Sequence, residues 1–436
     1  MDPLLLASMG IGAMFALIAL HVPIGVAMGL SGFVCVGLLL GWDPAISLFK
    51  TEPSGVVASR DLAVIPLFLL MGSFAGAAGL SSDLYRLAYA VVGHYRGGLA
   101  MSTIGACAGF GAVCGSSVAT AATMTRVALP EMLKRGYQPG LATGCIAAGG
   151  TLGMLIPPSV ILVLYAVLTE QFVIALFIAA VIPGLVAVLL HFAAILTYVR
   201  LNPDSGPAGP RMPWPERWRV LRDSWGVVTL AVVVSGGIYG GIFTVAEAAA
   251  IGVCMALFFT ILRGKLTWDI LWKVLSESAA NTGLIYLIII GAHIFTYFVT
   301  LSQLPSAMTE WIDSLGLHPL LVMFLLHLMY IILGSIFDTV AAMVITLPFV
   351  FPLIIGLGFD PIWFGVINVM VIEIGMITPP IGINVFVLHG IARDIPLATI
   401  FRGIVPFLIA DLIRLTILTL FPALALWLPG QLGMLM

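Results

Sequence analysis

Serine, threonine and glycine residues gather in an otherwise apolar part of the first half of the chain. Gly115-Ser116-Ser117 is followed by Thr120, and further small residues surround Gly153. Hydroxyl groups and carbonyl oxygens freed at helix breaks are the ligands that hard cations such as Na⁺ prefer. The predicted cation ligands are Gly115, Ser117, Thr120 and Gly153, and the predicted substrate contacts are Ser116, Thr151 and Pro157. The alternative is that these small residues only let helices approach closely.

A comparable set of residues follows in the second half of the chain. Its most informative member is Asp338, because a carboxylate inside a membrane-embedded segment is costly and marks a functional site by default. A structural salt bridge or a water-exposed position is the alternative for Asp338, and Asn384 faces either a crevice or the core. The predicted cation ligands are Gly334, Asp338, Thr339 and Gly375, and the predicted substrate contacts are Ser335, Thr378 and Asn384.

A motif that occurs once in each half is expected to position the predicted cation and substrate residues of that half. Gly-Met-x-x-Pro-Pro occurs at 153–158 and again at 375–380, 222 positions later. Paired prolines remove backbone donors and clash with the preceding turn, so each motif predicts a break in a helix. Two interrupted apolar segments in corresponding halves indicate a central binding site in a membrane transporter.

The composition is that of a membrane protein. Of the 436 residues, 61% are hydrophobic and 9% are charged, whereas soluble domains carry about 25% charged residues. We therefore expect an all-α polytopic protein embedded in a lipid bilayer. The net charge of −2 gives no indication of nucleic-acid binding. The five cysteines form no CxxC motif and are predicted to be small packing residues, and no cofactor is expected apart from a coupling cation.

Two repeats of similar organisation divide the chain. The predicted first repeat spans 1–200, a hydrophilic linker spans 201–222, and the second repeat spans 223–436. Each repeat is predicted to hold about five crossings, an amphipathic arm, a re-entrant hairpin and a broken helix. The hairpins are placed at 97–133, with its tip at 115–117, and 318–352, with its tip at Gly334-Ser335, and the broken helices at 140–168 and 361–390. The arms are placed at 43–60 and around 263–273, the latter before a separate span at 280–300.

The distribution of Lys and Arg predicts the orientation. With the N-terminus outside and an odd number of crossings per half, the two repeats are inverted relative to each other, an arrangement that permits alternating access. Only Lys50 and Arg60 then lie outside. The basic residues predicted to lie inside are Arg86, Arg96, Lys134, Arg135, the arginines of 200–222, Arg263, Lys265, Lys273, Arg393 and Arg402.

Other charged residues lie inside or beside apolar segments. Asp411 and Arg414 are three residues apart on one helix and are predicted to pair. Glu373 either senses the second broken helix or makes a polar contact between helices. Glu247 follows Thr244 by three residues, where capping of a helix and a functional role are equally consistent with the sequence.

Three stretches resemble the large membrane subunit of tripartite ATP-independent periplasmic (TRAP) transporters, and the resemblance covers essentially the whole chain. They are Gly149–Ser159, Gly240-Gly241-Ile242-Phe243-Thr244 with Glu247-Ala248-Ala249, and Glu373–Asn384. One departure is Val245, where the family usually has proline. The resemblance implies Na⁺-driven import of an organic acid of the dicarboxylate, sugar-acid or sialic-acid type across a bacterial inner membrane. It also implies an elevator mechanism, in which a transport domain with both hairpins and both broken helices slides against a scaffold, and cation sites at the hairpin tips and broken helices.

The resemblance further implies two partners. A periplasmic substrate-binding protein delivers the substrate, and a small four-helix membrane subunit, expected to be a separate chain, accompanies the large one. Two alternative functions remain, one for a transporter of another kind and one for an enzyme. A single-component Na⁺/dicarboxylate symporter would share the architecture but does not explain the Pro-Pro motifs. An intramembrane serine protease would use Gly115-Ser116-Ser117 with His191 or His293 as base, but it leaves the repeat unexplained, so we expect no enzyme activity.

Overall fold

A computed structural model describes residues 2–434 of the chain, and every regular element in that part is a helix. The first part of the chain forms five helices. They are α1 (Pro3–Ala19), α2 (Ile24–Leu40), α3 (Trp42–Ala58), α4 (Val64–Ala78) and α5 (Leu80–Val92). The α4–α5 pair is bent by 70° at Gly79, whose φ of +79° favours glycine. The helix α3 therefore lies in the segment predicted as the first amphipathic arm.

The first hairpin and the first broken helix follow. The hairpin contains α6 (Gly98–Cys114), α7 (Ser117–Val127) and the short α8 (Leu129–Lys134). The broken helix consists of α9 (Pro139–Leu155) and α10 (Val160–Leu168), which meet at 43°. A helix of 29 residues, α11 (Val173–Leu201), completes the half.

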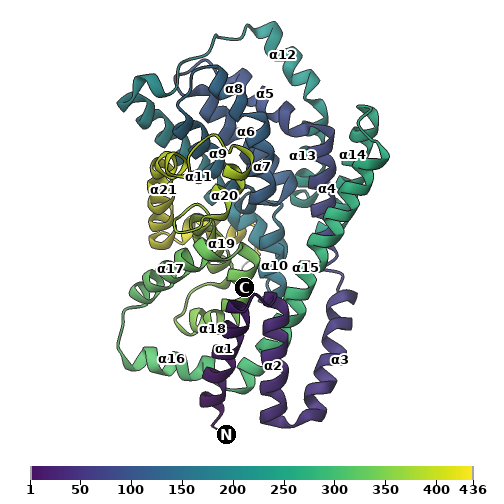
Figure 1. Ribbon diagram of the computed structural model, residues 1–436, viewed down its shortest axis with the longest axis vertical. Helices are drawn as coiled ribbons and strands as arrows, with labels where there is room; N and C mark the ends of the chain where they lie inside the picture. The colour runs from purple at the N-terminus through teal and green to yellow at the C-terminus, as the bar shows by residue number, and fades with distance from the viewer. Residues whose placement is uncertain (1, 435–436) are drawn as a thin grey trace.

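The hydrophilic linker contains a 3₁₀ turn at Pro203–Ser205 and α12 (Trp214–Asp223). Tyr137 fastens the linker to the first hairpin, because its hydroxyl donates to the Pro207 carbonyl at 3.1 Å and accepts from the Leu99 amide at 3.1 Å. Burial raises the pKa of Tyr137 to about 12. The phenol therefore stays neutral and keeps both hydrogen bonds at physiological pH. In Figure 1, α12 lies at one end of the long axis and the N-terminus at the other.

The second part of the chain continues in a similar order. It contains α13 (Trp225–Tyr239), α14 (Val245–Leu262), α15 (Trp268–Leu301), α16 (Leu304–Ser314), α17 (Pro319–Ile336), α18 (Thr339–Gly356), α19 (Pro361–Gly375), α20 (Ile383–Ile391), α21 (Leu397–Leu420) and α22 (Ala423–Gln431). Within the described residues, six helices are long and apolar enough to cross a membrane, or up to nine if each bent pair is one span. A polytopic membrane protein accounts for this pattern.

Two predicted boundaries in the second half are wrong. The arm expected around 263–273 and the span expected at 280–300 are one continuous 34-residue helix, α15, because nothing between them stops a helix. The tip of the second hairpin lies at Phe337-Asp338 rather than at Gly334-Ser335, which belong to the last turn of α17. Asp338 caps α18 through a 2.7 Å hydrogen bond from the Ala341 amide, and this capping determines where the return arm begins.

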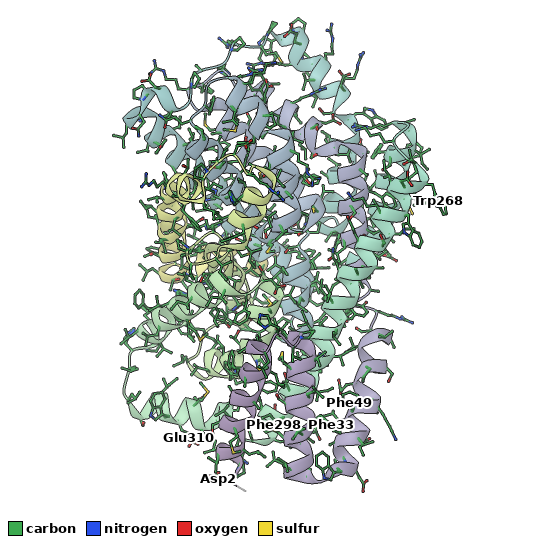
Figure 2. The ribbon with its side chains drawn as sticks, in the orientation of Figure 1. Asp2, Phe33, Phe49, Trp268, Phe298 and Glu310 are labelled. Atoms are coloured by element: carbon green, nitrogen blue, oxygen red, sulfur yellow. The ribbon has the colours of Figure 1, made fainter. Side chains whose placement is uncertain are left out.

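Helices outside the hairpins pack in two long pairs, α2 along α15 and α4 along α14. The surface of α2 that faces α15 carries Gly25, Gly29 and Gly32, and a Cβ atom at Gly25 would lie 2.4 Å from the Leu287 carbonyl oxygen. Small residues at this spacing let two backbones approach closely. Beside them, Phe33 of α2 meets Phe49 of α3 edge to face at 5.4 Å (Figure 2).

Candidate functional site

The first hairpin turns at two residues with non-helical conformations. Gly115 ends α6 in a left-handed conformation with φ of +65°, which glycine adopts without steric cost. Ser116 is the N-cap of α7, and its side chain accepts from the Ala119 amide at 3.4 Å. The predicted tip at 115–117 therefore coincides with the observed break.

This tip packs against the first broken helix. A Cβ atom at Gly115 would lie 3.0 Å from Val160 and 3.8 Å from the Pro158 carbonyl oxygen, so the turn touches the break directly. A Cβ atom at Gly153 would lie 3.0 Å from the Thr120 hydroxyl and 3.4 Å from the Ser116 carbonyl oxygen. The structure thus brings together the oxygen-bearing residues that the sequence predicted to meet here.

Proline chemistry frees carbonyl oxygens at the same place. Pro157 and Pro158 have no N–H, so the carbonyls of Gly153 and Met154 lose the donors that a continuous helix would supply. The Ser159 hydroxyl donates to the Met154 carbonyl instead. No donor among the described residues bonds the Gly153 carbonyl, which leaves this oxygen without a hydrogen bond.

In the second broken helix, other groups donate hydrogen bonds to the carbonyl oxygens that the prolines leave without helical donors. The Thr378 amide donates to the Gly375 carbonyl at 2.9 Å, and the Asn384 amide donates to the Met376 carbonyl at 3.2 Å. The Thr378 hydroxyl turns back to the Ile374 carbonyl at 2.6 Å. The carbonyls freed by Pro379 and Pro380 therefore have partners, and the segment 376–382 forms a compact bonded turn.

The second hairpin packs against this turn. A Cβ atom at Gly375 would lie 2.7 Å from the Gly334 Cα, so the two glycines allow α17 and α19 to touch. The Gly382 amide donates to the Ser335 carbonyl at 3.1 Å, whereas the Ser335 hydroxyl bonds the Ile332 carbonyl of its own helix. Asp338 is exposed at the tip and pairs with no basic side chain within 4.0 Å among the described residues.

Two methionines join the hairpins to the broken helices at the centre. The Ser117 hydroxyl lies 3.5 Å from the Met376 sulfur and 3.4 Å from the Asn384 side-chain oxygen. The Thr339 hydroxyl lies 2.9 Å from the Met376 sulfur and 3.3 Å from the Met154 sulfur. Ser117, Thr339 and Asn384 are fully or almost fully buried, so this contact layer lies inside the protein.

The two remaining predicted substrate contacts, Thr151 and Pro157, are buried inside the protein. Thr151 lies inside α9 with its hydroxyl on the Ala148 carbonyl, and Pro157 is buried. Sequence reasoning gave no role to Met154, Met376 or Ser159. The signal for the two methionines was the repeated Gly-Met-x-x-Pro-Pro motif, in which both occupy the same position, whereas Ser159 has no counterpart because position 381 is isoleucine.

A buried charged network lies behind the second broken helix. Arg414 lies 3.1 Å from Asp411 and 3.8 Å from Glu373, and His191 lies 3.0 Å from Asp411. The predicted Asp411–Arg414 pair is confirmed, and Glu373 makes a contact between helices. The network joins α19, α21 and α11, and all four side chains are at most 2% exposed.

The serine-protease alternative finds no catalytic geometry. His191 bonds Asp411, and His293 lies 3.1 Å from Glu52. The Ser117 hydroxyl contacts Asn384 and Met376 rather than a histidine. A nucleophilic serine needs a base within hydrogen-bond reach, and neither histidine serves Ser117 in this way.

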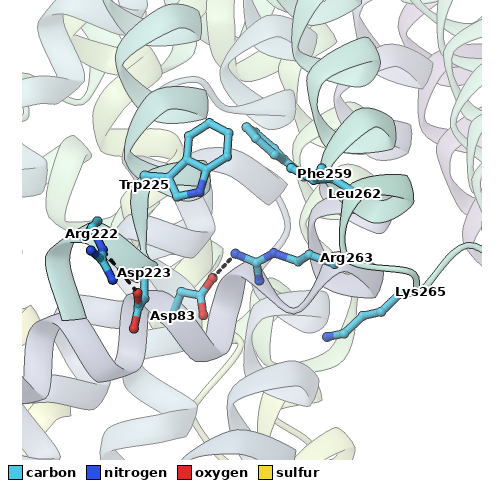
Figure 3. Close-up of a pocket in the computed structure, with 9 residues that line it drawn as sticks. Asp83, Arg222, Asp223, Trp225, Phe259, Leu262, Arg263 and Lys265 are labelled. Carbon is cyan, nitrogen blue, oxygen red and sulfur yellow. Dashed lines mark hydrogen bonds and ion pairs between the residues drawn. The ribbon is translucent and has the colours of Figure 1, made fainter. Parts of the chain in front are cut away.

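Two of the clefts away from this centre are lined by opposite ends of α14. One, of about 710 Å³, opens between the ends of α10 and α14 and the loop before α4, and it includes Arg60, Asp61, Glu170 and Thr244. The other, of about 540 Å³, is shown in Figure 3, where Arg263 of the α14 end pairs with Asp83 of α5. Neither contains a predicted site residue, so the candidate site is the crossing of hairpins and broken helices.

Comparison with known proteins identifies this arrangement. Residues 11–424 match the family described as the tripartite ATP-independent periplasmic transporter, DctM component. The chain belongs to this family. It is 38% identical to the C4-dicarboxylate TRAP transporter large permease protein DctM of Pseudomonas aeruginosa, over 94% of this chain and 95% of that one. It is 30% identical to the sialic acid TRAP transporter large permease protein SiaM of Vibrio cholerae, over 90% and 91% of the two chains.

A solved structure shares the fold. The YdaH transporter of Alcanivorax borkumensis superposes with a TM-score of 0.58 at 15% identity, covering 91% of this chain and 90% of that one. The family match and the apolar helices show that the chain is a multi-pass membrane protein and a large permease component of the TRAP type. The chain belongs to a family of transporter permeases rather than of enzymes, and the single-component alternative gives way to a permease of the tripartite family.

Proposed function

We propose that this DctM protein imports a carboxylate-bearing organic acid across a bacterial inner membrane, driven by Na⁺. The substrate class is that of a dicarboxylate, sugar acid or sialic acid. The relatives named for C4-dicarboxylates and sialic acid support it. A periplasmic binding protein delivers the substrate, and a small four-helix membrane subunit is the second membrane partner.

The observation that carries the proposal is the location of four half-helix N-termini in two contacting pairs of helices, α7 with α20 and α10 with α18. The helices α7, α10, α18 and α20 all begin at the hairpin tips or at the Pro-Pro breaks. A helix N-terminus carries a partial positive charge and attracts carboxylates. Ser116, Ser335, Thr378 and Asn384 lie at or near these breaks and are the proposed substrate contacts.

Two oxygen-rich sites are proposed for Na⁺. The first contains Gly115, Ser117, Thr120 and Gly153. It is supported by the unbonded Gly153 carbonyl and by the packing of Thr120 on Gly153, where a Cβ atom would lie 3.0 Å from the Thr120 hydroxyl. The second contains Gly334, Asp338, Thr339 and Gly375. The charge of Asp338 at the tip, together with the Gly334–Gly375 contact, supports the second site. Hydroxyl, carbonyl and carboxylate oxygens are the ligands that hard cations prefer.

An elevator movement is the proposed mechanism. The two hairpins and two broken helices pack on one another, since α7 contacts α9 and α20, and α18 contacts α19 and α10. The long pairs α2–α15 and α4–α14 form the proposed scaffold. The two groups meet where α15 packs on α18 and α4 packs on α6, and we propose that one group slides against the other along these contacts.

The test is the thermal stability of the purified protein in NaCl, KCl and choline chloride at equal ionic strength. A cation that binds only the folded state stabilises by about 2.7 kcal/mol at 100 times its Kd. We expect a Na⁺-specific rise in Tm that is reduced in Thr120→Val. Thr143→Val is the matched control, because Thr143 is buried in α9 with its hydroxyl on the Pro139 carbonyl.

Absence of a Na⁺-specific rise in the wild-type protein would overturn the sodium assignment. If Thr120→Val and Thr143→Val reduce the Na⁺-specific rise in Tm equally, the assignment of the first Na⁺ site is contradicted. Uptake of radiolabelled succinate into proteoliposomes that contain both membrane subunits and the binding protein then tests the substrate class. Uptake that is independent of an imposed Na⁺ gradient would contradict the coupling.

A further inference from the structure

A basic cleft lies beside the first hairpin, apart from the proposed transport site. It has a volume of about 480 Å³ and is formed by one face of α5 and by the end of the hairpin. Arg86 comes from α5, Arg126 from the last turn of α7, and Arg135 from the end of α8. Glu131 is the one acidic residue among those that line the cleft.

The charges of this cleft are unbalanced. Arg135 pairs with Glu131 at 2.7 Å, donates to the Tyr89 hydroxyl and lies over the Tyr89 ring. Neither Arg86 nor Arg126 has an acidic partner within 4.0 Å among the described residues. Two guanidinium groups therefore remain available to an anion. Their planar forks suit phosphate and carboxylate oxygens.

A buried hydroxyl group provides an independent indication of a ligand. Tyr85 lines the cleft, its side chain is 6% exposed, and its hydroxyl has no hydrogen-bond partner among the described residues. A buried polar group without a partner costs about 1–3 kcal/mol. An oxygen of a bound anion would accept from this hydroxyl and remove that cost. The positive partial charge at the start of α6, where Leu99 also lines the cleft, favours the same occupant.

We propose that this cleft binds an anionic oxygen group, with Arg86 and Arg126 as its charged partners and Tyr85 as a donor. The distribution of Lys and Arg assigns this side to the cytoplasm. The group then belongs either to the phosphate of an anionic lipid in the inner leaflet or to a free anion in the cytoplasm. Basic pockets between membrane helices on this side are suited to lipid phosphates.

The experiment measures the Tm of the full chain in nanodiscs. In one arm, phosphatidylcholine discs receive potassium phosphate, against potassium chloride at equal ionic strength. In the other arm, phosphatidylglycerol replaces part of the phosphatidylcholine. We expect Tm to rise in at least one arm. A rise only with phosphatidylglycerol identifies a lipid headgroup, and a rise with potassium phosphate identifies a free anion.

The variants decide whether this cleft is responsible. Arg126→Gln changes an exposed side chain, so it should fold, and we expect the apparent affinity to fall by at least about tenfold. Tyr85→Phe should weaken binding less, and Arg402→Gln, which changes an exposed arginine on α21, should leave it unchanged. Absence of a rise in both arms for the wild-type protein, or an undiminished rise in Arg126→Gln, would overturn the proposal. Both readouts are independent of Na⁺.

Discussion

The Ser117 hydroxyl lies 3.5 Å from the Met376 sulfur, so the return arm of the first hairpin contacts the broken helix of the other half. The corresponding contact joins Thr339 of the second hairpin to Met154 of the first broken helix, at 3.3 Å. Both partners are shifted by 222 positions between the two contacts. Each hairpin therefore touches the motif of the opposite half, and the centre forms only when both halves have folded.

Two substitutions at Asp338 distinguish its role as a helix cap from its proposed role as a cation ligand. Asn caps a helix about as well as Asp, so Asp338→Asn should keep the cap of α18 and leave Tm in KCl unchanged. Asp338→Ala should lower the free energy of unfolding by about 1 kcal/mol, because the bond to Ala341 is lost. We expect both variants to lose Na⁺-specific stabilisation at the second site. Thermal unfolding in NaCl and KCl measures this, and unaltered stabilisation of Asp338→Asn would exclude the carboxylate as a ligand.

Gly111 tests the close approach of the first hairpin to α9. A Cβ atom there would lie 2.2 Å from the Gly153 Cα, and backbone cannot yield as a flexible side chain does. Gly111→Ala should therefore lower the free energy of unfolding by about 1–3 kcal/mol or more, measured by chemical denaturation in detergent. Gly283→Ala in α15 is the control, because a Cβ atom there meets nothing within 4 Å. Equal stability of the two variants would show that the helices can separate without cost.

Arg414 holds two buried carboxylates at the interface of α19 and α21. Arg414→Met leaves Glu373 without its cationic partner in a buried position, and we expect a loss of about 3–5 kcal/mol of unfolding free energy. In a Glu373→Leu background, Arg414→Met should lower the unfolding free energy by less. Asp411 is then the one carboxylate of the network, and it still has His191 as a partner. A double-mutant cycle by denaturant unfolding measures the coupling. Strictly additive losses would show that Glu373 and Arg414 do not interact.

Val245 occupies the first helical position of α14, after the N-cap Thr244 and its capping box with Glu247. Proline suits this position, because its fixed φ matches the helix and its missing N–H is not needed there. Val245→Pro should raise the unfolding free energy by about 0.4–1 kcal/mol. Val253→Pro, in the middle of the same helix, should lower it by about 3 kcal/mol or more. A fall in Tm for Val245→Pro would mean that the backbone at this position is not helical.

The helix breaks were predictable because their causes are local. Proline lacks an N–H wherever it stands, so both Pro-Pro motifs interrupt a helix whatever surrounds them. The same holds for the first hairpin, where Gly115 and Ser116 supply a left-handed residue and a cap in succession. The Asp411–Arg414 pair was predictable for a similar reason, since residues three apart on a helix are neighbours.

The second hairpin shows where local reasoning failed. The sequence offered Gly334-Ser335 as the turn of this hairpin. In the structure, Gly334 instead lies in a helix against Gly375, and Asp338 caps the return arm. A glycine serves equally well in a turn and at a close helix contact, so its type alone could not distinguish them.

By itself, the sequence determined the membrane class, the repeated motif and the helix break at each Pro-Pro pair, because composition and proline chemistry act over a few residues. Only the tertiary structure decided that Ser117 meets Met376 and Asn384, that His191 and Glu373 join the Asp411–Arg414 pair, and that three arginines surround Tyr85. These partners come from separate helices, and several are more than 200 residues apart in the chain. Such contacts depend on how whole helices pack, which no local pattern specifies.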